Sequence, residues 1–188
     1  MSVFSAELRE QAEGVKARYP AGRERSAILP LLYLAQSVEG SVTREGLREV
    51  ADLLGLTTAE VEAVATFYTM LRVRPTGKHL ISICTNLSCA VLGARELFDR
   101  AHEALGPQSE DATPDGMFSL HEEECLGACD AAPVVQIDFS NHDRVTQEGL
   151  LEMIEQLRRG ETPEPSRGTA AQDFRDASRI LAGLGGGQ

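Results

Sequence analysis

Four cysteines, arranged as two closely spaced pairs, are the residues of this chain best suited to chemistry. Cys84 and Cys89 lie in "CTNLSC", and Cys125 and Cys129 lie in "CLGAC". Each pair lies beside a segment with the pattern of a β-strand, so two rigid elements would present the thiols from two loops. Cysteine thiolates can bind zinc or iron, form disulfides or exchange with other thiols, and the spacing of the pairs helps to separate these alternatives.

Two of these alternatives fit the cysteines poorly. A thioredoxin-type exchange centre has two residues between its cysteines, whereas the pairs here enclose four and three residues. Disulfides persist in oxidising compartments, and the first residues show neither a secretion signal nor a transit-peptide pattern, so we expect reduced thiols in the cytosol. Structural zinc stays open, because all-cysteine sites permit these spacings.

A [2Fe–2S] cluster fits the two pairs well. Each iron takes two thiolates, so each loop can serve one iron. Backbone N–H groups in such loops can turn toward sulfur and offset the negative charge of the cluster. Gly127, between Cys125 and Cys129, permits the positive φ and the close backbone approach that such a loop needs.

The composition is that of a folded, acidic protein. The chain has 188 residues, 42% of them apolar, and a formal net charge of −11. An acidic surface repels phosphate groups, so we expect no nucleic acid among its partners and favour a partner with a basic face. No apolar run reaches the roughly 20 residues that span a bilayer, so we expect no direct membrane insertion.

Residues 1–76 are predicted to form an N-terminal helical bundle. Apolar residues recur at helical spacing in four segments, namely residues 4–19, 26–36, 43–55 and 57–71. Thr43 and Gly55 are suited to cap the third helix, and Thr57 with Glu60 can form a capping box at the start of the fourth. Helices this short must pack on one another to be stable.

Residues 77–160 are predicted to form a small α/β domain. Pro75 and Gly77 mark the change, and the strand patterns that follow cover residues 79–84, 117–124, 133–138 and 142–146. Helical patterns cover residues 90–106 and 147–160. The order β-α-β-β-β-α predicts helices that cover a mixed sheet.

Residues 161–188 are predicted to form a flexible C-terminal tail. The segment "ETPEPSRGTAAQDF" contains prolines and serines, and the end "GLGGGQ" has the composition of a flexible linker. One short helix is expected near residues 175–184.

The cysteine motifs and several other segments resemble one known family. "CTNLSC", "CLGAC" followed by "DAAPVVQID", "SAILPLLYLAQ", "FYTMLRVRPTGKH" and "TPDGMFSL" are similar to the two-iron subunit family of respiratory NADH:quinone oxidoreductase (complex I). The resemblance implies an α+β fold, an N-terminal helical bundle followed by a thioredoxin-like α/β ferredoxin domain. It also implies that Cys84, Cys89, Cys125 and Cys129 bind one [2Fe–2S] cluster per chain. Glu123 departs from the family, which often has an apolar residue there, and this concerns the local field at the cluster.

The same resemblance implies a role in electron transfer. The chain would be an oxidoreductase subunit that does not oxidise NADH alone and exchanges single electrons with the flavin of an NADH-oxidising partner. That partner would bind FMN and NADH, and a larger iron–sulfur subunit of the same peripheral arm would be a second partner, on the cytoplasmic side of the inner membrane. "GLGGG" follows no strand and opens no helix, so it is not a nucleotide loop. Because NADH delivers two electrons as hydride, a flavin elsewhere must separate them.

Two other functions stay open at this point. One is the equivalent diaphorase subunit of an NAD-linked hydrogenase or formate dehydrogenase, since these enzymes use the same flavin and two-iron module. The other is a zinc-stabilised interaction module with no redox role. The acidic run of Glu122, Glu123 and Glu124 is expected to be a solvated strand face in preference to a docking surface.

Overall fold

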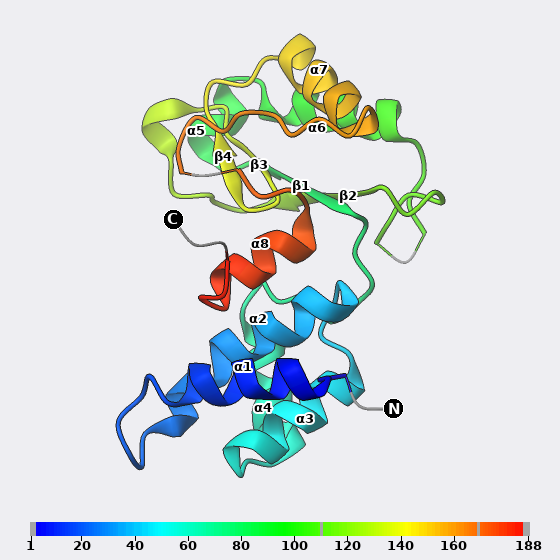
Figure 1. The fold of residues 1–188 in the computed structure, drawn as a ribbon. Helices are drawn as coiled ribbons and strands as arrows, with labels where there is room; N and C mark the ends of the chain where they lie inside the picture. The colour runs from blue at the N-terminus through cyan, green and yellow to red at the C-terminus, as the bar shows by residue number, and fades with distance from the viewer. Residues whose placement is uncertain (1–2, 110, 169, 186–188) are drawn as a thin grey trace. The chain divides into compact units, whose positions relative to one another are not determined.

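A computed structural model of the chain describes residues 3–109, 111–168 and 170–185. The chain divides into two compact units, which we call the helical unit (Met1–Pro75 with Arg175–Gln188) and the sheet unit (Thr76–Phe174). Figure 1 shows the helices and strands of both. Among the described residues, none of the helices combines the length and the apolar character needed to cross a membrane.

The helical unit is built around α2 (Ile28–Glu39), whose Leu31, Leu32 and Leu34 are fully buried. Its other elements are α1 (Ala6–Lys16), the 3₁₀ helix η1 (Glu24–Ala27), α3 (Arg44–Leu54), α4 (Thr58–Phe67) and all but the first residue of α8 (Phe174–Leu181). Apolar residues of α1, η1, α2, α3 and α4 share one core with Ala182, the residue that follows α8, and each of these short helices buries one face in it.

The helix ends in this unit follow the sequence signals. The hydroxyl of Thr43 accepts a hydrogen bond from Gly46 N–H at 3.1 Å, and Gly55 ends α3 at a φ of 64°. Thr57 and Glu60 form both bonds of the capping box. The predicted fourth helix is too long, however, because α4 ends at Phe67 where Tyr68 adopts an extended conformation.

The end of the chain differs from the flexible tail that the sequence predicts. Helix α8 is fastened to α2 by Gln36, whose amide donates to Ser178 Oγ at 3.0 Å and to Met70 O at 3.1 Å. The side-chain oxygen of Gln36 accepts from Arg72 N–H at 2.7 Å, so this fully buried amide is satisfied on both sides. Residues 186–188 lie outside the described part of the chain.

The sheet unit contains a four-stranded mixed sheet in the order β2-β1-β3-β4. Strand β1 (His79–Cys84) pairs in parallel with β2 (Phe118–Glu123), whereas β3 (Val135–Ile137) pairs antiparallel with both β1 and β4 (Ser140–His142). The remaining elements are α5 (Leu87–Val91), α6 (Ala94–Leu105), the 3₁₀ helix η2 (Cys129–Ala131) and α7 (Gln147–Arg158). Helices α6 and α7 lie side by side against the sheet (Figure 1).

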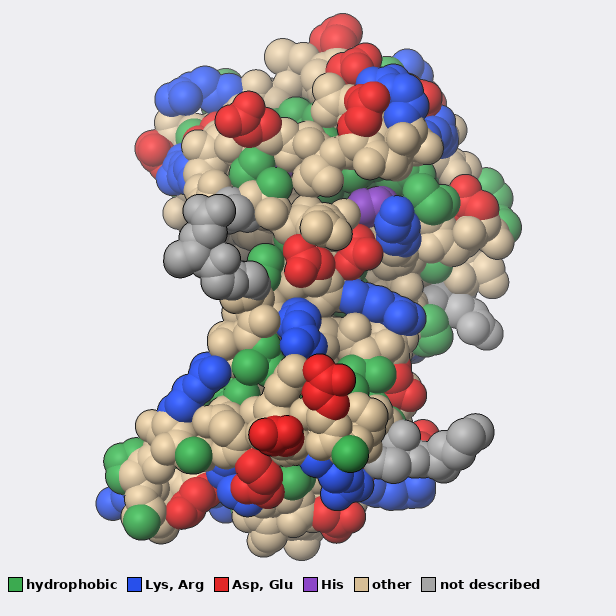
Figure 2. Space-filling model, in the orientation of Figure 1, with side chains coloured by type: hydrophobic (Ala, Val, Ile, Leu, Met, Phe, Trp, Pro, Cys, Tyr) green, Lys and Arg blue, Asp and Glu red, His purple; other side chains and the backbone are tan. Residues whose placement is uncertain are grey.

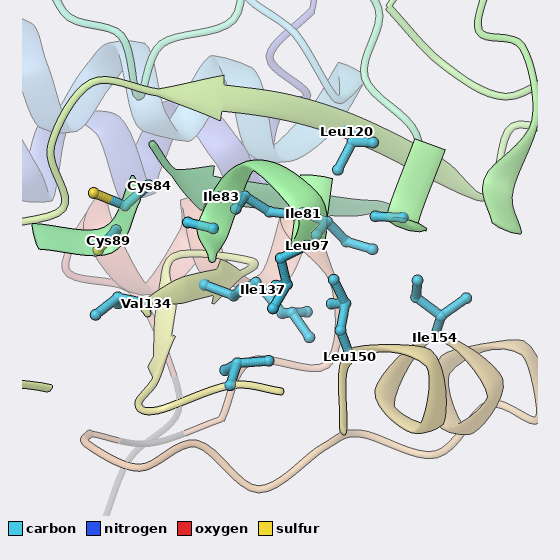
Figure 3. Close-up of a cluster of buried hydrophobic side chains, with 14 of the residues drawn as sticks. Ile81, Ile83, Cys84, Cys89, Leu97, Leu120, Val134, Ile137, Leu150 and Ile154 are labelled. Carbon is cyan, nitrogen blue, oxygen red and sulfur yellow. The ribbon is translucent and has the colours of Figure 1, made fainter. Parts of the chain in front are cut away.

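The core of the sheet unit lies between the strands and these two helices. Ile81 and Ile83 of β1 meet Leu97 of α6, and Leu150 and Ile154 of α7 complete the packing (Figure 3). All five side chains are at most 2% exposed. The sequence therefore predicts strand β1 and helix α7 correctly, although all six residues of β1 are buried, whereas an alternating pattern is typical of a strand with one exposed face.

Several element boundaries in this unit differ from the prediction, and two of the differences change the local structure. The strand predicted at 142–146 is instead β4, which begins at Ser140 and ends at His142, because Asp138 and Phe139 form a two-residue turn with φ values of 49° and 66°. Such turns are usually marked by Asn-Gly or Asp-Gly, and this one has no glycine. The predicted helix at 90–106 is two helices, because Gly93 at a φ of 92° separates α5 from α6 and leaves Cys89 inside α5.

A buried polar pair holds the β3–β4 turn against β1. Asp138 Oδ2 lies 2.8 Å from His79 Nδ1, and Asp138 Oδ1 accepts from Leu80 N–H at 2.8 Å. Burial raises the pKa of Asp138, and its bonds to His79 oppose that effect. The segment expected to be a tail lies beside the next strand, where Ser166 N–H donates to Asn141 O at 2.8 Å.

Gly77 is predicted to tolerate no side chain. A Cβ at this position would lie 2.5 Å from the backbone carbon of Phe118, and backbone cannot move aside as a side-chain tip can. We expect Gly77→Ala to lower the free energy of unfolding by about 1–3 kcal/mol, as overpacking does elsewhere. Denaturant titration of the full chain, followed by far-UV circular dichroism, would measure this change.

Gly14→Ala is the matched control. Gly14 lies within α1 with no atom within 4 Å of the added Cβ, so the same substitution should raise the free energy of unfolding by about 0.5–1 kcal/mol through helix propensity. Equal stability of Gly77→Ala and the wild type would refute the close approach at Phe118.

Candidate metal centre

The parallel pairing of β1 and β2 brings the two cysteine loops to one edge of the sheet. Cys84 is the last residue of β1 and lies opposite Glu123, the last residue of β2. Cys125 follows two residues later. The pairing continues past the strands, because Thr85 N–H donates to Glu123 O at 3.0 Å.

The first cysteine pair is buried. Cys84 is 3% exposed and Cys89 is 2% exposed, and Figure 3 shows both at the same end of the buried hydrophobic cluster. Backbone holds Cys84, whose N–H donates to Val134 O at 3.1 Å. Cys89 lies in α5, where the side chain of Asn86 caps the helix by accepting from Leu87 N–H at 2.7 Å.

Burial also sets the acidity of this pair. It raises the pKa of the Cys89 thiol to about 11, and the nearby Cys84 and Cys129 thiols act in the same direction. Three of the four predicted residues are therefore close enough to influence one another. A thiol in such surroundings ionises when a cation lies beside it, which is what a metal ion supplies.

The second pair is exposed. Cys125 lies in the loop that follows β2, Cys129 is the first residue of η2, and the neighbouring Ala128 and Ala131 are buried. Gly127 adopts a φ of 71°, as predicted, and its N–H lies 3.4 Å from Cys125 Sγ. The N–H of Gly127 is thus directed at the sulfur of Cys125.

The two loops border an open cavity of about 260 Å³ lined by Thr85, Asn86 and Glu124. All four cysteines are free thiols. Within the described ranges, no three His, Cys, Asp or Glu side chains surround a common point suited to a single metal ion. A [2Fe–2S] cluster requires a different arrangement, in which each of its two irons binds two thiolates. Two loops that carry two cysteines each fit this requirement.

Several residues near the cysteines were not predicted from the sequence. The hydroxyl of Thr85 donates to Glu122 Oε1 at 2.6 Å. Arg167 lies 3.6 Å from Asp130, the neighbour of Cys129, and 2.8 Å from Asp143. The sequence does not single out Arg167, because the composition of its segment predicts a flexible tail.

The net negative charge of the chain is not gathered into one patch on the visible face. Figure 2 shows acidic and basic side chains interspersed there, including over α7. On that helix Arg158 pairs with Glu155, and Arg159 pairs with Glu152. These exposed pairs contribute little to stability, since each remains well solvated.

The sequence matches one protein-family description over residues 12–158, that of the thioredoxin-like [2Fe–2S] ferredoxins. It is 48% identical over 179 residues to the E subunit of the NADH-quinone oxidoreductase of Mycobacterium tuberculosis, covering 95% of this chain and 70% of that protein. It is 40% identical over 162 residues to NADH-quinone oxidoreductase subunit 2 of Thermus thermophilus, covering 86% of this chain and 90% of that protein.

A solved structure shares the fold. A chain of an NAD⁺-reducing [NiFe]-hydrogenase in the H2-reduced state superimposes with a TM-score of 0.62 at 22% sequence identity. The match covers 70% of this chain and 22% of the hydrogenase chain. The match to the family description and the identity to the two NADH-quinone oxidoreductase subunits agree with the motifs of the two cysteine loops, and the chain belongs to the thioredoxin-like [2Fe–2S] ferredoxin family.

Proposed function

We propose that this chain is the electron-transferring [2Fe–2S] subunit of an NADH:quinone oxidoreductase. Cys84 and Cys89 would hold one iron of a single cluster, and Cys125 and Cys129 would hold the other. The observation that carries the proposal is the position of both pairs at one edge of the sheet, at the ends of two parallel strands. Membership of a [2Fe–2S] ferredoxin family supports the same assignment.

The residues around the cysteines have separate tasks in this proposal. When bound, the cluster accepts and releases one electron at a time. The backbone and α5 fix the buried pair, so Cys84 and Cys89 would keep their geometry when the charge changes. The N–H of Gly127 offsets negative charge on the sulfur of Cys125. The exposed pair brings the centre close to the surface, where another redox group can approach.

The proposed partner is a flavin-bearing, NADH-binding subunit. NADH gives up two electrons as hydride, and a one-electron centre cannot accept them together, so FMN in the partner would divide them. A larger iron–sulfur subunit of the same peripheral arm would be a second partner. The complex would lie on the cytoplasmic side of the inner membrane, with the helical unit providing a large part of the docking surface.

The hydrogenase-type assembly is the second candidate. The match to an NAD⁺-reducing [NiFe]-hydrogenase chain shows a shared fold, and it favours no particular partner. The higher identity to two NADH-quinone oxidoreductase subunits favours the respiratory assembly. Subunits that co-purify with the native chain would separate the two.

The first prediction concerns the metal content. The full chain, prepared anaerobically, should contain about two irons and two acid-labile sulfides, and it should be reddish brown. Cys125→Ala should lose most of both, because one iron loses a thiolate, whereas Ser88→Ala in α5 should keep them. Iron, sulfide and zinc analysis of the three proteins would decide, and stoichiometric zinc without sulfide would refute the cluster.

The second prediction concerns the electron donor. The isolated chain should be reduced by dithionite and not by NADH, since a one-electron centre does not accept hydride. When the flavin-bearing subunit of the same organism is added, NADH should reduce the cluster. The measurement is the loss of the cluster's visible absorption after NADH is mixed with the two proteins. NADH oxidation by the isolated chain would overturn the division of roles between the subunits.

A further inference from the structure

Thr85 and Glu122 form a side-chain link across the ends of β1 and β2. The hydroxyl of Thr85 donates to Glu122 Oε1 at 2.6 Å, within the range of a hydrogen bond to a charged acceptor. Thr85 directly follows Cys84, and Glu122 precedes Cys125 by three residues. Glu122 lies in β2, so the link joins the first residue of the Cys84–Cys89 loop to the end of the strand from which the Cys125–Cys129 loop leaves.

The backbone supports the same connection. Thr85 N–H donates to Glu123 O at 3.0 Å, so Thr85 is held to β2 through its main chain as well as its side chain. Beyond this point the thiol of Cys84 lies 3.9 Å from Glu124 O. Thr85 and Glu124 also line the cavity between the loops. The strand pairing thus ends in a set of bonds directly beside the cysteines.

The second loop has few buried anchors near Cys125. Glu124, Cys125 and Gly127 are all exposed. Exposed loops open locally at low free energy, and an opening that separates the loops would break thiolate bonds to one iron. The hydrogen bond from Thr85 to Glu122 opposes this opening, because it holds the start of the first loop to the end of β2 in addition to the backbone bond between Thr85 N–H and Glu123 O.

We propose that Thr85 is a positioning residue for the metal centre, which through Glu122 holds the start of the Cys84–Cys89 loop on the end of β2, the strand that leads into the Cys125–Cys129 loop. The inference rests on the proposed binding of a [2Fe–2S] cluster by these loops. The link slows release of the cluster and fixes the angle between the two thiolate pairs. Loss of the hydroxyl then changes retention and the spectrum of the reduced centre, while the four cysteines remain in place.

The test compares Thr85→Val, which lacks the hydroxyl, with Thr85→Ser, which keeps it. In an anaerobic chelator challenge of the full chain, Thr85→Val should lose its visible absorption about five times faster than the wild type. Thr85→Ser should stay within about twofold of it. The reduced-state EPR signal should change in Thr85→Val alone. Thr66→Val, whose hydroxyl donates to Glu62 O in α4, is the control for a threonine change in the other unit.

Substitution of Glu122 tests the link from its other end. Glu122→Ala should accelerate cluster loss as Thr85→Val does, and the double variant should be no faster than either single variant, because both remove one bond. Glu122→Gln keeps an acceptor and removes a negative charge, so it should retain the cluster and raise its reduction potential. Because Glu122 is exposed, these variants should fold even where Thr85→Val does not.

The outcomes separate this inference from the proposed function. A wild-type chain without iron and sulfide would refute the cluster itself. A loaded wild type with Thr85→Val equal to Thr85→Ser in release rate and EPR signal would refute the positioning role alone. Additive rates in the double variant would also refute it, since they would mean that Thr85 and Glu122 act separately.

Discussion

The parallel pairing of β1 and β2 is the constraint on which the site depends. Parallel strands end at the same edge of a sheet, so the residues after Cys84 and after Glu123 must emerge side by side. An antiparallel pair would send the two loops to opposite edges. The parallel arrangement also requires a long crossover, and α5 and α6 supply it while they bury the face of β1.

The crossover explains why the two cysteine pairs differ in burial. Cys89 lies in the first helix of the crossover, so the first pair becomes part of the hydrophobic core. The second pair follows β2, where the chain leaves the sheet and turns through Gly127 before β3. The centre that we propose therefore has one side fixed by the core and one side held by loop contacts. The bond between Thr85 and Glu122 lies where the two sides meet, because it joins the start of the first loop to the end of β2.

The sequence predicts those parts of the fold that local signals specify. The pattern of β1, the helix α7 and the caps at Thr43 and Thr57 depend on neighbouring residues and are confirmed. The β3–β4 turn is missed because Asp138 adopts a positive φ without a glycine, supported by a bond to His79 of β1, which is far away in the sequence. Packing of α8 is missed for the same reason, since the contact between Gln36 and Ser178 joins residues far apart in the chain.

The sequence predicts only part of the candidate site. As in the fold, the parts that it misses depend on contacts between residues far apart in the chain. Residue type and spacing are enough to single out the four cysteines and the role of Gly127. The crossover helices determine which thiols are buried. The sequence pattern predicts one helix there and misses the break at Gly93. Thr85 and Arg167 acquire their partners only when strands pair and the chain end returns to the sheet.

The central claim is that each cysteine pair binds one iron of a single cluster. Mössbauer spectroscopy of the ⁵⁷Fe-loaded, reduced full chain tests it most directly, because it distinguishes the two irons. We expect two iron environments in equal amounts, one ferric and one ferrous, both with tetrahedral sulfur coordination and magnetically coupled. A single uncoupled ferrous site bound by four thiolates, or no iron bound at the cysteines, would contradict the account.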